Sequence, residues 1–166
     1  LGLKIIIKNS KINAINLLLN PISSLRYFEF DFADRYLKNY KSCKLLDVSS
    51  PKILPFWAAD AYQCQVTMIN PDLLDLNESI KMSSYLKNYS HIQFDENIDA
   101  TNLPYPDSTF DMSTSISVIE HINGDGDSKA IGEFIRVVRP GGMILLTFPV
   151  KEKYFEEFRS SDPYGT

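Results

Sequence analysis

From residue 44 onward, short apolar runs alternate with amphipathic stretches along the chain. The apolar runs predict strands at 44–48, 65–69, 91–94, 110–115 and 143–148. The stretches between them predict helices at 53–61, 73–86 and 128–138, the last of which ends before Pro140-Gly141-Gly142. Strands that alternate with helices form parallel sheets, and strands that are apolar throughout need cover on both faces. We therefore expect an α/β fold with a mostly parallel, twisted sheet and helices on both of its faces.

The first 41 residues have a different pattern and predict an N-terminal helical segment. Apolar side chains recur at helical spacing up to Pro21: Ile12, Ile15, Leu18 and Leu19. A second helix is expected to carry four apolar residues on one side: Phe28, Phe32, Tyr36 and Leu37. We interpret the aromatic residues of this segment and of the helix at 53–61 as core or helix-packing residues: Tyr27, Phe28, Phe30, Phe32, Phe56 and Trp57.

The composition argues against several classes of protein. The 166 residues include 17 basic and 21 acidic ones, which gives a net charge of −4, so we expect no nucleic-acid partner. No apolar run approaches the roughly 20 residues that cross a bilayer, so we expect no membrane partner. Cys43 and Cys64 lack metal-ligand spacing and are too few for a disulfide framework. They favour buried, reduced thiols, a cytoplasmic location and no metal site.

Three segments, taken in order, resemble a known family. Residues 99–111 read DATNLPYPDSTFD, residues 118–122 read VIEHI, and residues 133–149 read EFIRVVRPGGMILLTFP. Together they resemble the class I S-adenosyl-L-methionine-dependent methyltransferases. The resemblance implies a Rossmann-like fold in a single domain over 1–166, with a helical segment at 1–41, a nucleotide-binding core at 42–150 and a polar tail at 151–166. It also implies S-adenosyl-L-methionine as the cofactor and methyl transfer to a small-molecule or saccharide-like acceptor.

The resemblance implies a cofactor site at the residues that follow the strands, because ligands of open parallel sheets bind beyond the carboxyl ends of the strands. In the family, the acidic residue that matches Asp99 accepts a hydrogen bond from the adenine amine, and the backbone at the position of Ala100 meets the ring. The alternative for Asp99 is a turn cap without a ligand. The other candidate cofactor residues are Asp47, Ser49, Ser50, Asn70, Asp72 and Ser117.

The sequence departs from the family at two cofactor positions. The family usually has G-x-G-x-G after an acidic residue, but residues 47–53 read DVSSPKI and contain no glycine. Glycine permits positive φ and close backbone approach, which serine permits only in part. Asn70 stands where a carboxylate normally binds the ribose hydroxyls, and Asp72 is a candidate substitute.

These departures favour a second interpretation from a different class of protein, a non-catalytic relative that serves as a binding or assembly module. A nicotinamide-dependent Rossmann enzyme is the least favoured interpretation, because the sequence contains no G-x-G-x-x-G.

Glu120 and His121 are the candidates for acid–base catalysis, and Tyr105 is the candidate for the substrate side of the site. Each has a structural alternative. A lone histidine on a helix is more often a structural residue than a catalyst, which is the alternative for His121. Tyr105 is equally interpretable as a residue that packs between two prolines. We interpret Asp111, at the start of a predicted strand, as a structural turn residue.

The sheet of this family has seven strands, whereas five are predicted here. We therefore expect the last two strands to be missing and the edge of the strand at 143–148 to be uncovered. An uncovered edge predicts a homo-oligomer through that strand or a longer parent chain.

Overall fold

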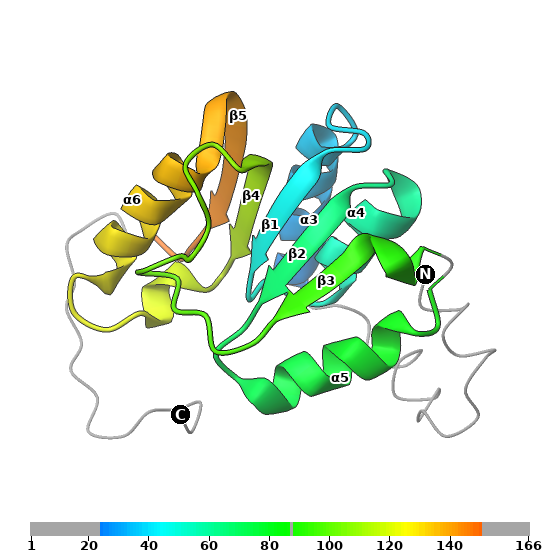
Figure 1. The fold of residues 1–166 in the computed structure, drawn as a ribbon, viewed down its shortest axis with the longest axis horizontal. Coiled ribbons are helices and arrows are strands. Elements are labelled where there is room, and N and C mark those ends of the chain that lie inside the picture. Colours follow the sequence, from blue (N-terminus) through cyan, green and yellow to red (C-terminus); the bar gives the residue numbers. More distant parts are fainter. Residues whose placement is uncertain (1–23, 87, 151–166) are drawn as a thin grey trace.

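The computed structural model describes residues 24–86 and 88–150. These residues form a five-stranded sheet in which every neighbouring pair of strands is parallel (Figure 1). From edge to edge, the strands are β3 (Ile92–Asp95), β2 (Gln65–Ile69), β1 (Lys44–Val48), β4 (Phe110–Ile116) and β5 (Val138–Thr147). The strand order reverses between β1 and β4, where ligands of such sheets bind. The predicted Rossmann-like α/β sheet is confirmed.

Helices cover both faces of the sheet, as Figure 1 shows. They are α3 (Ser24–Leu37), α4 (Ile53–Ala61), α5 (Leu73–Ser83) and α6 (Gly126–Val137), with single 3-10 turns η1 (Tyr89–His91) and η2 (Ile119–His121). Leu45 of β1 packs in one core with Phe56 of α4. Its neighbour Leu46 packs in a second core with Phe134 of α6. Successive side chains of a strand point to opposite faces, so a core lies on each side of the sheet.

The junction of α6 and β5 differs from the expectation. α6 ends at Val137 and β5 begins at the next residue, so the segment 138–142 belongs to the strand. Gly141 has a φ of +76°, and the register of β5 on β4 shifts close to this point. A Cβ on Gly142 would lie 2.5 Å from the carbonyl oxygen of Asp111. The two strands approach so closely here that glycine is required, which explains why a turn-like sequence occurs within a strand.

The end of α5 also differs from the expectation. The helix ends at Ser83 rather than at residue 86. The hydroxyls of Ser83 and Ser84 donate hydrogen bonds to the carbonyl oxygens of Ile80 and Lys81 in the last turn. Serine competes for helix carbonyls in this way and favours a helix end over a continuing helix.

The aromatic residues of α3 are more exposed than expected. The side of α3 that faces the sheet carries three buried residues: Glu29, Ala33 and Leu37. Tyr27 and Phe28 point elsewhere and are 65% and 68% exposed, so their interpretation as core residues is wrong. A helix presents one face to a sheet, and the i, i+4, i+8 positions of Glu29, Ala33 and Leu37 occupy that face. Phe56 is fully buried and Phe30 packs against the same core, as expected, whereas Phe32 and Trp57 are each 38% exposed. Trp57 donates a 2.7 Å hydrogen bond to Asp34.

The structure bears on three further predictions, which concern the two ends of the chain, the cysteine thiols and membrane-spanning helices. The predicted helix with Ile12, Ile15, Leu18 and Leu19 and the polar tail at 151–166 lie outside the described residues. Cys43 and Cys64 are buried free thiols, as predicted, and their Sγ atoms lie 3.1 Å apart. Among residues 24–86 and 88–150, no helix is long and apolar enough to span a bilayer.

Candidate functional site

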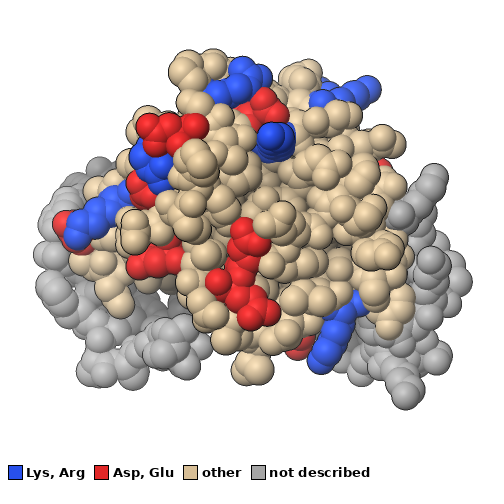
Figure 2. Space-filling view, viewed as in Figure 1, with Lys and Arg blue, Asp and Glu red and all other residues tan. Residues whose placement is uncertain are grey.

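The carboxyl ends of the strands bring the predicted cofactor residues to one edge of the sheet. The registers pair Val48 with Ile69 and Ile69 with Asp95, so β1, β2 and β3 end at the same level. The segments that follow these strands carry Ser49, Ser50, Asn70, Asp72, Asp99 and Ala100. Acidic side chains gather in the middle of Figure 2, where the arrows of β2 and β3 end in Figure 1. This edge is therefore polar and negatively charged.

Asp47 is a fully buried carboxylate near the end of β1. Its Oδ1 accepts a 2.7 Å hydrogen bond from the Thr114 hydroxyl of β4. Its Oδ2 is buried without a hydrogen-bond partner among the described residues. Burial raises the pKa of Asp47 to about 6, and Thr114 together with the hydroxyl and backbone N–H of the adjacent Ser50 opposes this rise only in part. An oxygen of this kind marks a place where a further polar group would be stabilised.

The loop after β1 takes a backbone conformation that normally belongs to glycine. Ser49 has a φ of +53°, and its backbone N–H donates a 2.9 Å hydrogen bond to the carbonyl oxygen of Ile69. The left-handed conformation thus forms here without glycine, and the limited approach of a cofactor to the Ser49 backbone stays a prediction. The buried Ser50 hydroxyl accepts a 3.1 Å hydrogen bond from the N–H of Ile116, which ties the loop to β4.

Asn70 and Asp72 are engaged in starting α5. The Asn70 side chain donates a 3.0 Å hydrogen bond to Asp75 and accepts one of 2.9 Å from the N–H of Asp72. Oδ1 of Asp72 accepts from the N–H groups of Leu74 and Asp75, which makes Asp72 the N-cap of α5. The amide of Asn70 is thus used at both ends within the protein, and Asp72 has a structural role of its own.

Asp99 and Ala100 lie in the segment after β3. Oδ1 of Asp99 accepts 2.8 Å hydrogen bonds from both the N–H and the hydroxyl of Thr101. This is the turn cap that the sequence offered as an alternative. The cap uses one carboxylate oxygen, so it is compatible with a ligand at the other. Ala100 is half-buried and packs against the core under α6.

Tyr105 anchors the segment between β3 and β4. Its hydroxyl donates a 2.7 Å hydrogen bond to Asp95 at the end of β3, and its ring lies edge-on to Phe110 with centroids 5.1 Å apart. Burial and the neighbouring Asp95 carboxylate raise the pKa of the Tyr105 hydroxyl above its ordinary value. These contacts give Tyr105 a structural role in the loop that carries Asp99.

Arg136 of α6 holds the same loop from the other side. Its guanidinium donates to the carbonyl oxygens of Leu103 and Tyr105 and forms ion pairs with Glu133 and Asp107. Glu133 in turn accepts a 2.7 Å hydrogen bond from the N–H of Leu103. The E-x-x-R segment of the sequence therefore fixes the loop, a role that the sequence did not reveal.

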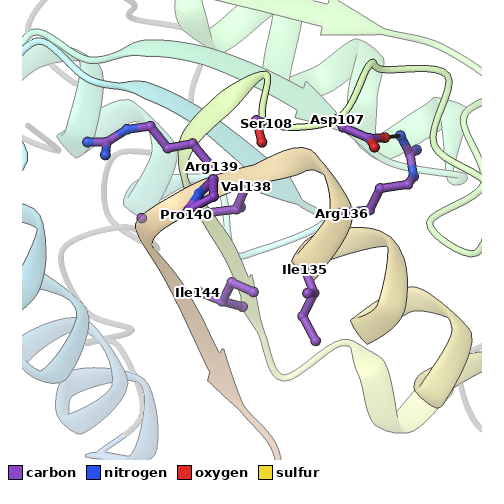
Figure 3. A pocket seen from close by; sticks show the side chains of 9 residues that line it. Asp107, Ser108, Ile135, Arg136, Val138, Arg139, Pro140 and Ile144 are labelled. Atoms are coloured by element: carbon purple, nitrogen blue, oxygen red, sulfur yellow. Dashed lines mark hydrogen bonds and ion pairs between the residues drawn. The ribbon is translucent and has the colours of Figure 1, made fainter.

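A cavity of about 370 Å³ lies at the opposite end of β4 and β5 (Figure 3). The side chains of Arg136 and Arg139 point away from each other at its rim, Arg136 toward Asp107. Asp111 pairs at this end with Arg139 and accepts from the backbone N–H of Lys44, which supports its interpretation as a structural residue. The cavity is thus separate from the edge where the predicted cofactor residues gather.

Glu120 and His121 form part of the short turn η2, which follows β4. Nε2 of His121 lies 3.9 Å from Oε1 of Glu120, and the His121 side chain is 49% exposed. The Glu120 side chain is 21% exposed, and both residues lie beside the carboxyl end of β4. Within the described residues, no group of three or more His, Cys, Asp or Glu side chains is arranged to hold a metal ion.

Glu29 of α3 reaches the same edge and was not among the predicted site residues. It is 7% exposed, and its Oε1 accepts hydrogen bonds from the hydroxyls of Ser117 and Thr147 at 2.5 and 3.0 Å. Its Oε2 accepts one of 2.8 Å from Arg26. Burial alone would raise the pKa of Glu29, but the hydrogen bonds from Ser117, Arg26 and Thr147 outweigh it and lower the pKa. The i, i+3 spacing of Arg26 and Glu29 before the first strand was the available sequence signal.

Ser117, a predicted cofactor residue, is fixed by this network. It has a φ of +54°, and its N–H donates to the carbonyl oxygen of Thr147 at 2.9 Å. Left-handed serines thus follow both β1 and β4, the two central strands between which the order reverses. Unusual backbone conformations at such a point are typical of ligand sites.

Comparison with known proteins gives one family and several relatives. The sequence profile of a family described as "Methyltransferase domain" matches residues 46–146. The chain is 37% identical to a tRNA (carboxymethyluridine(34)-5-O)-methyltransferase of Arabidopsis thaliana, over 36% of this chain and 19% of that protein. It is 36% identical to norajmaline N-methyltransferase of Rauvolfia serpentina, over 51% of this chain and 27% of that protein. The matched part thus spans about a quarter or less of these relatives.

Solved structures share the fold at lower sequence identity. The structure of geranyl diphosphate methyltransferase in complex with GPP and sinefungin superposes with a TM-score of 0.64 at 13% identity, covering 80% of this chain and 49% of that one. The cyclase SpnF superposes with a TM-score of 0.60 at 21% identity, covering 72% and 45%. Proteins with different named chemistries share this fold, so a function must be argued from the site.

Proposed function

Since the chain belongs to the class I, Rossmann-like methyltransferase family, we propose that it transfers a methyl group from S-adenosyl-L-methionine to a small-molecule acceptor. The observation that carries this proposal is the convergence of the loops after β1, β2 and β3 at one edge, with Ser49 in the left-handed conformation at the first of them. A left-handed residue at this position gives the loop the backbone shape that glycine would give it.

The residues at this edge fit the cofactor at its adenine and amino-acid ends. Asp99 keeps a carboxylate oxygen for the adenine amine, and the small Ala100 allows the ring to approach the backbone. The N–H and the hydroxyl of Ser49 both donate to the carbonyl oxygen of Ile69, so the lone pairs of the hydroxyl are what Ser49 offers to the ammonium of the methionine part. At the ribose, Asn70 offers an amide that is already used by Asp72 and Asp75, so we expect weak binding there.

S-adenosyl-L-methionine, when bound, supplies a methyl group on a sulfonium that is already activated for transfer. The chain then has to hold the acceptor in line and remove a proton where the acceptor carries one. His121 is exposed beside the carboxyl end of β4 and accepts that proton, with Glu120 3.9 Å away to stabilise the charge that forms. Tyr105, which the sequence assigned to the substrate side, instead shapes the loop through Asp95.

A small, neutral or cationic acceptor, saccharides included, fits this edge better than a nucleic acid. Asp95, Glu96 and Asp99 follow one another closely at the end of β3, and the chain has a net charge of −4. Carboxylates at the entrance repel a phosphate backbone, whose binding depends on cations. The N-methyltransferase named for norajmaline among the relatives supports a small-molecule acceptor.

Calorimetric titration with S-adenosylmethionine and S-adenosylhomocysteine tests the proposal. We expect both to bind, and we expect Asp99→Asn to weaken both by about tenfold through loss of a charge-assisted hydrogen bond. Asp31→Asn, which removes a surface carboxylate paired with Arg35 on α3, is the matched control and should leave both affinities unchanged. Transfer of a labelled methyl group to small-molecule fractions then identifies the acceptor. Absence of binding by the unmodified chain would refute the proposal.

The engagement of Asn70 favours a second candidate function. A carboxylate that would hold the ribose is replaced by an amide that starts α5. A non-catalytic binding or assembly module would tolerate this loss, since it needs the fold and not the cofactor. The two functions separate in one measurement, because the module would keep its fold and bind neither nucleoside.

A further inference from the structure

We infer that Glu29 makes the site prefer the positively charged S-adenosylmethionine over its neutral product S-adenosylhomocysteine. The inference rests on the proposed function and adds a specificity-determining residue to it. The two nucleosides differ by one methyl group and one positive charge. A buried carboxylate at the transfer edge therefore acts on one and not on the other.

The Glu29 carboxylate lies at the carboxyl ends of two strands. Glu29 belongs to α3, but both hydroxyls that its Oε1 accepts from lie at the ends of strands, Ser117 directly after β4 and Thr147 at the end of β5. These are the carboxyl ends of the strands, the edge that also carries Ser49 and Asp99. The negative charge therefore lies at the carboxyl ends of β4 and β5, beside the loop after β1, and not on the outer surface of α3.

The sign of the local charge depends on the ion pair between Glu29 and Arg26. Glu29 is paired with Arg26, but the Glu29 side chain is 8% exposed whereas that of Arg26 is 35% exposed. Solvent screens the arginine more strongly than the carboxylate. Both hydroxyls donate to Glu29 and keep it ionised, so the interior side of the pair is negative.

The buried negative charge of Glu29 distinguishes the sulfonium of S-adenosylmethionine from the thioether of S-adenosylhomocysteine. A sulfonium is stabilised by a carboxylate that cannot be hydrated, whereas a thioether is not. After transfer, the positive charge on sulfur is lost and with it this part of the binding. Glu29 thus favours cofactor entry and product release without touching the acceptor.

The test measures the ratio of the two affinities, because a purely structural role would change both affinities equally. We expect Glu29→Gln to lower the preference for S-adenosylmethionine about fivefold, the effect of one partly screened charge. Arg26→Gln removes the opposing charge and should raise the preference. Glu29→Asp keeps the charge and should restore the ratio. Asp31→Asn removes a charge from the same helix, where Asp31 pairs at the surface with Arg35, and should leave the ratio unchanged.

Thermal unfolding of each variant reports separately on the fold. The inference is supported when Glu29→Gln and Arg26→Gln shift the ratio in opposite directions. It is overturned if the unmodified chain binds both nucleosides and neither variant moves the ratio, while the proposed function stands. If the unmodified chain binds neither nucleoside, the proposed function and this inference fail together.

Discussion

The buried carboxylate of Asp47 should make the protein less stable as the pH rises. Burial raises its pKa from 3.8 to about 6 in the folded protein. Between these values the folded state binds a proton that the unfolded state has released, so stability is lost as the pH rises from about 4 to above 6. A shift of about two pKa units corresponds to about 3 kcal/mol of unfolding free energy that is present at low pH and absent at pH 7.5.

Asp47→Asn removes the titration and should therefore change stability in a pH-dependent way. The amide resembles the protonated acid, so the variant and the unmodified chain should have similar unfolding free energies at pH 4. At pH 7.5 the unfolding free energy of the variant, relative to that of the unmodified chain, should be higher than at pH 4 by up to about 3 kcal/mol. Urea unfolding at intervals between pH 4 and 8 measures the difference.

Asp99→Asn provides the control, because Asp99 is an exposed carboxylate at the same edge. The pH dependence that comes from Asp47 should persist in this variant. If the Asp47→Asn curve ran parallel to that of the unmodified chain over this range, the assignment of a raised pKa to Asp47 would be wrong. Nucleoside binding by the Asp47→Asn variant, measured alongside, shows whether the cofactor uses Oδ2 of Asp47. If the variant gains stability but loses affinity for the nucleoside, Asp47 has a functional role.

Three further predictions concern the loop, the start of α5 and the arginine of α6. Ser49→Gly should stabilise the fold by up to about 1 kcal/mol and tighten S-adenosylmethionine binding, because φ is +53° there. Ser42 has a φ of +55° at the amino end of the sheet, so Ser42→Gly should give a similar gain in stability and no change in affinity. If both variants changed the affinity equally, the placement of Ser49 in the cofactor site would be wrong. Asn70→Asp places a carboxylate about 3 Å from that of Asp75 and should lower the free energy of unfolding in urea at pH 7 by about 1–3 kcal/mol. Adding Asp75→Asn to this variant should restore the lost stability. Arg136→Lys should speed hydrogen exchange in the loop at 103–107, and an unchanged rate would contradict the role given to the guanidinium.

The elements of the fold were readable from the sequence because the sheet is parallel and covered on both faces. Strands of this kind are short apolar runs, and those at 44–48 and 65–69 match β1 and β2 residue for residue. The start of β5 at Val138 was not readable. Its first residues include Pro140 and two glycines, and only the close backbone of β4 keeps them in a strand.

The sequence predicts which residues lie at this edge when their position depends only on following a strand. It does not predict residues that reach the edge through contacts with distant parts of the chain. Asp99 and Ser117 reach the expected edge because they follow strands. Glu29 was missed because its partners lie 88 and 118 residues further along the chain. The engagement of Asn70 depends on local contacts with Asp75, which the sequence contains but whose geometry only the folded loop provides.

The two departures from the family motif have different physical consequences, and the difference bears on how activity should be sought. Ser49 takes the left-handed conformation at a cost of about 1–2 kcal/mol, so the loss of glycine lowers stability and keeps the shape of the loop. Asn70 replaces the carboxylate that is usual in the family, and its amide is bonded at the start of α5, so we expect a lower cofactor affinity with the sheet edge kept in place. From a site that keeps its shape while losing a charge, we expect weak cofactor binding with the alignment kept. Weak binding of S-adenosylmethionine is therefore not a sign of an inactive relative, and transfer has to be assayed at cofactor concentrations well above the measured Kd.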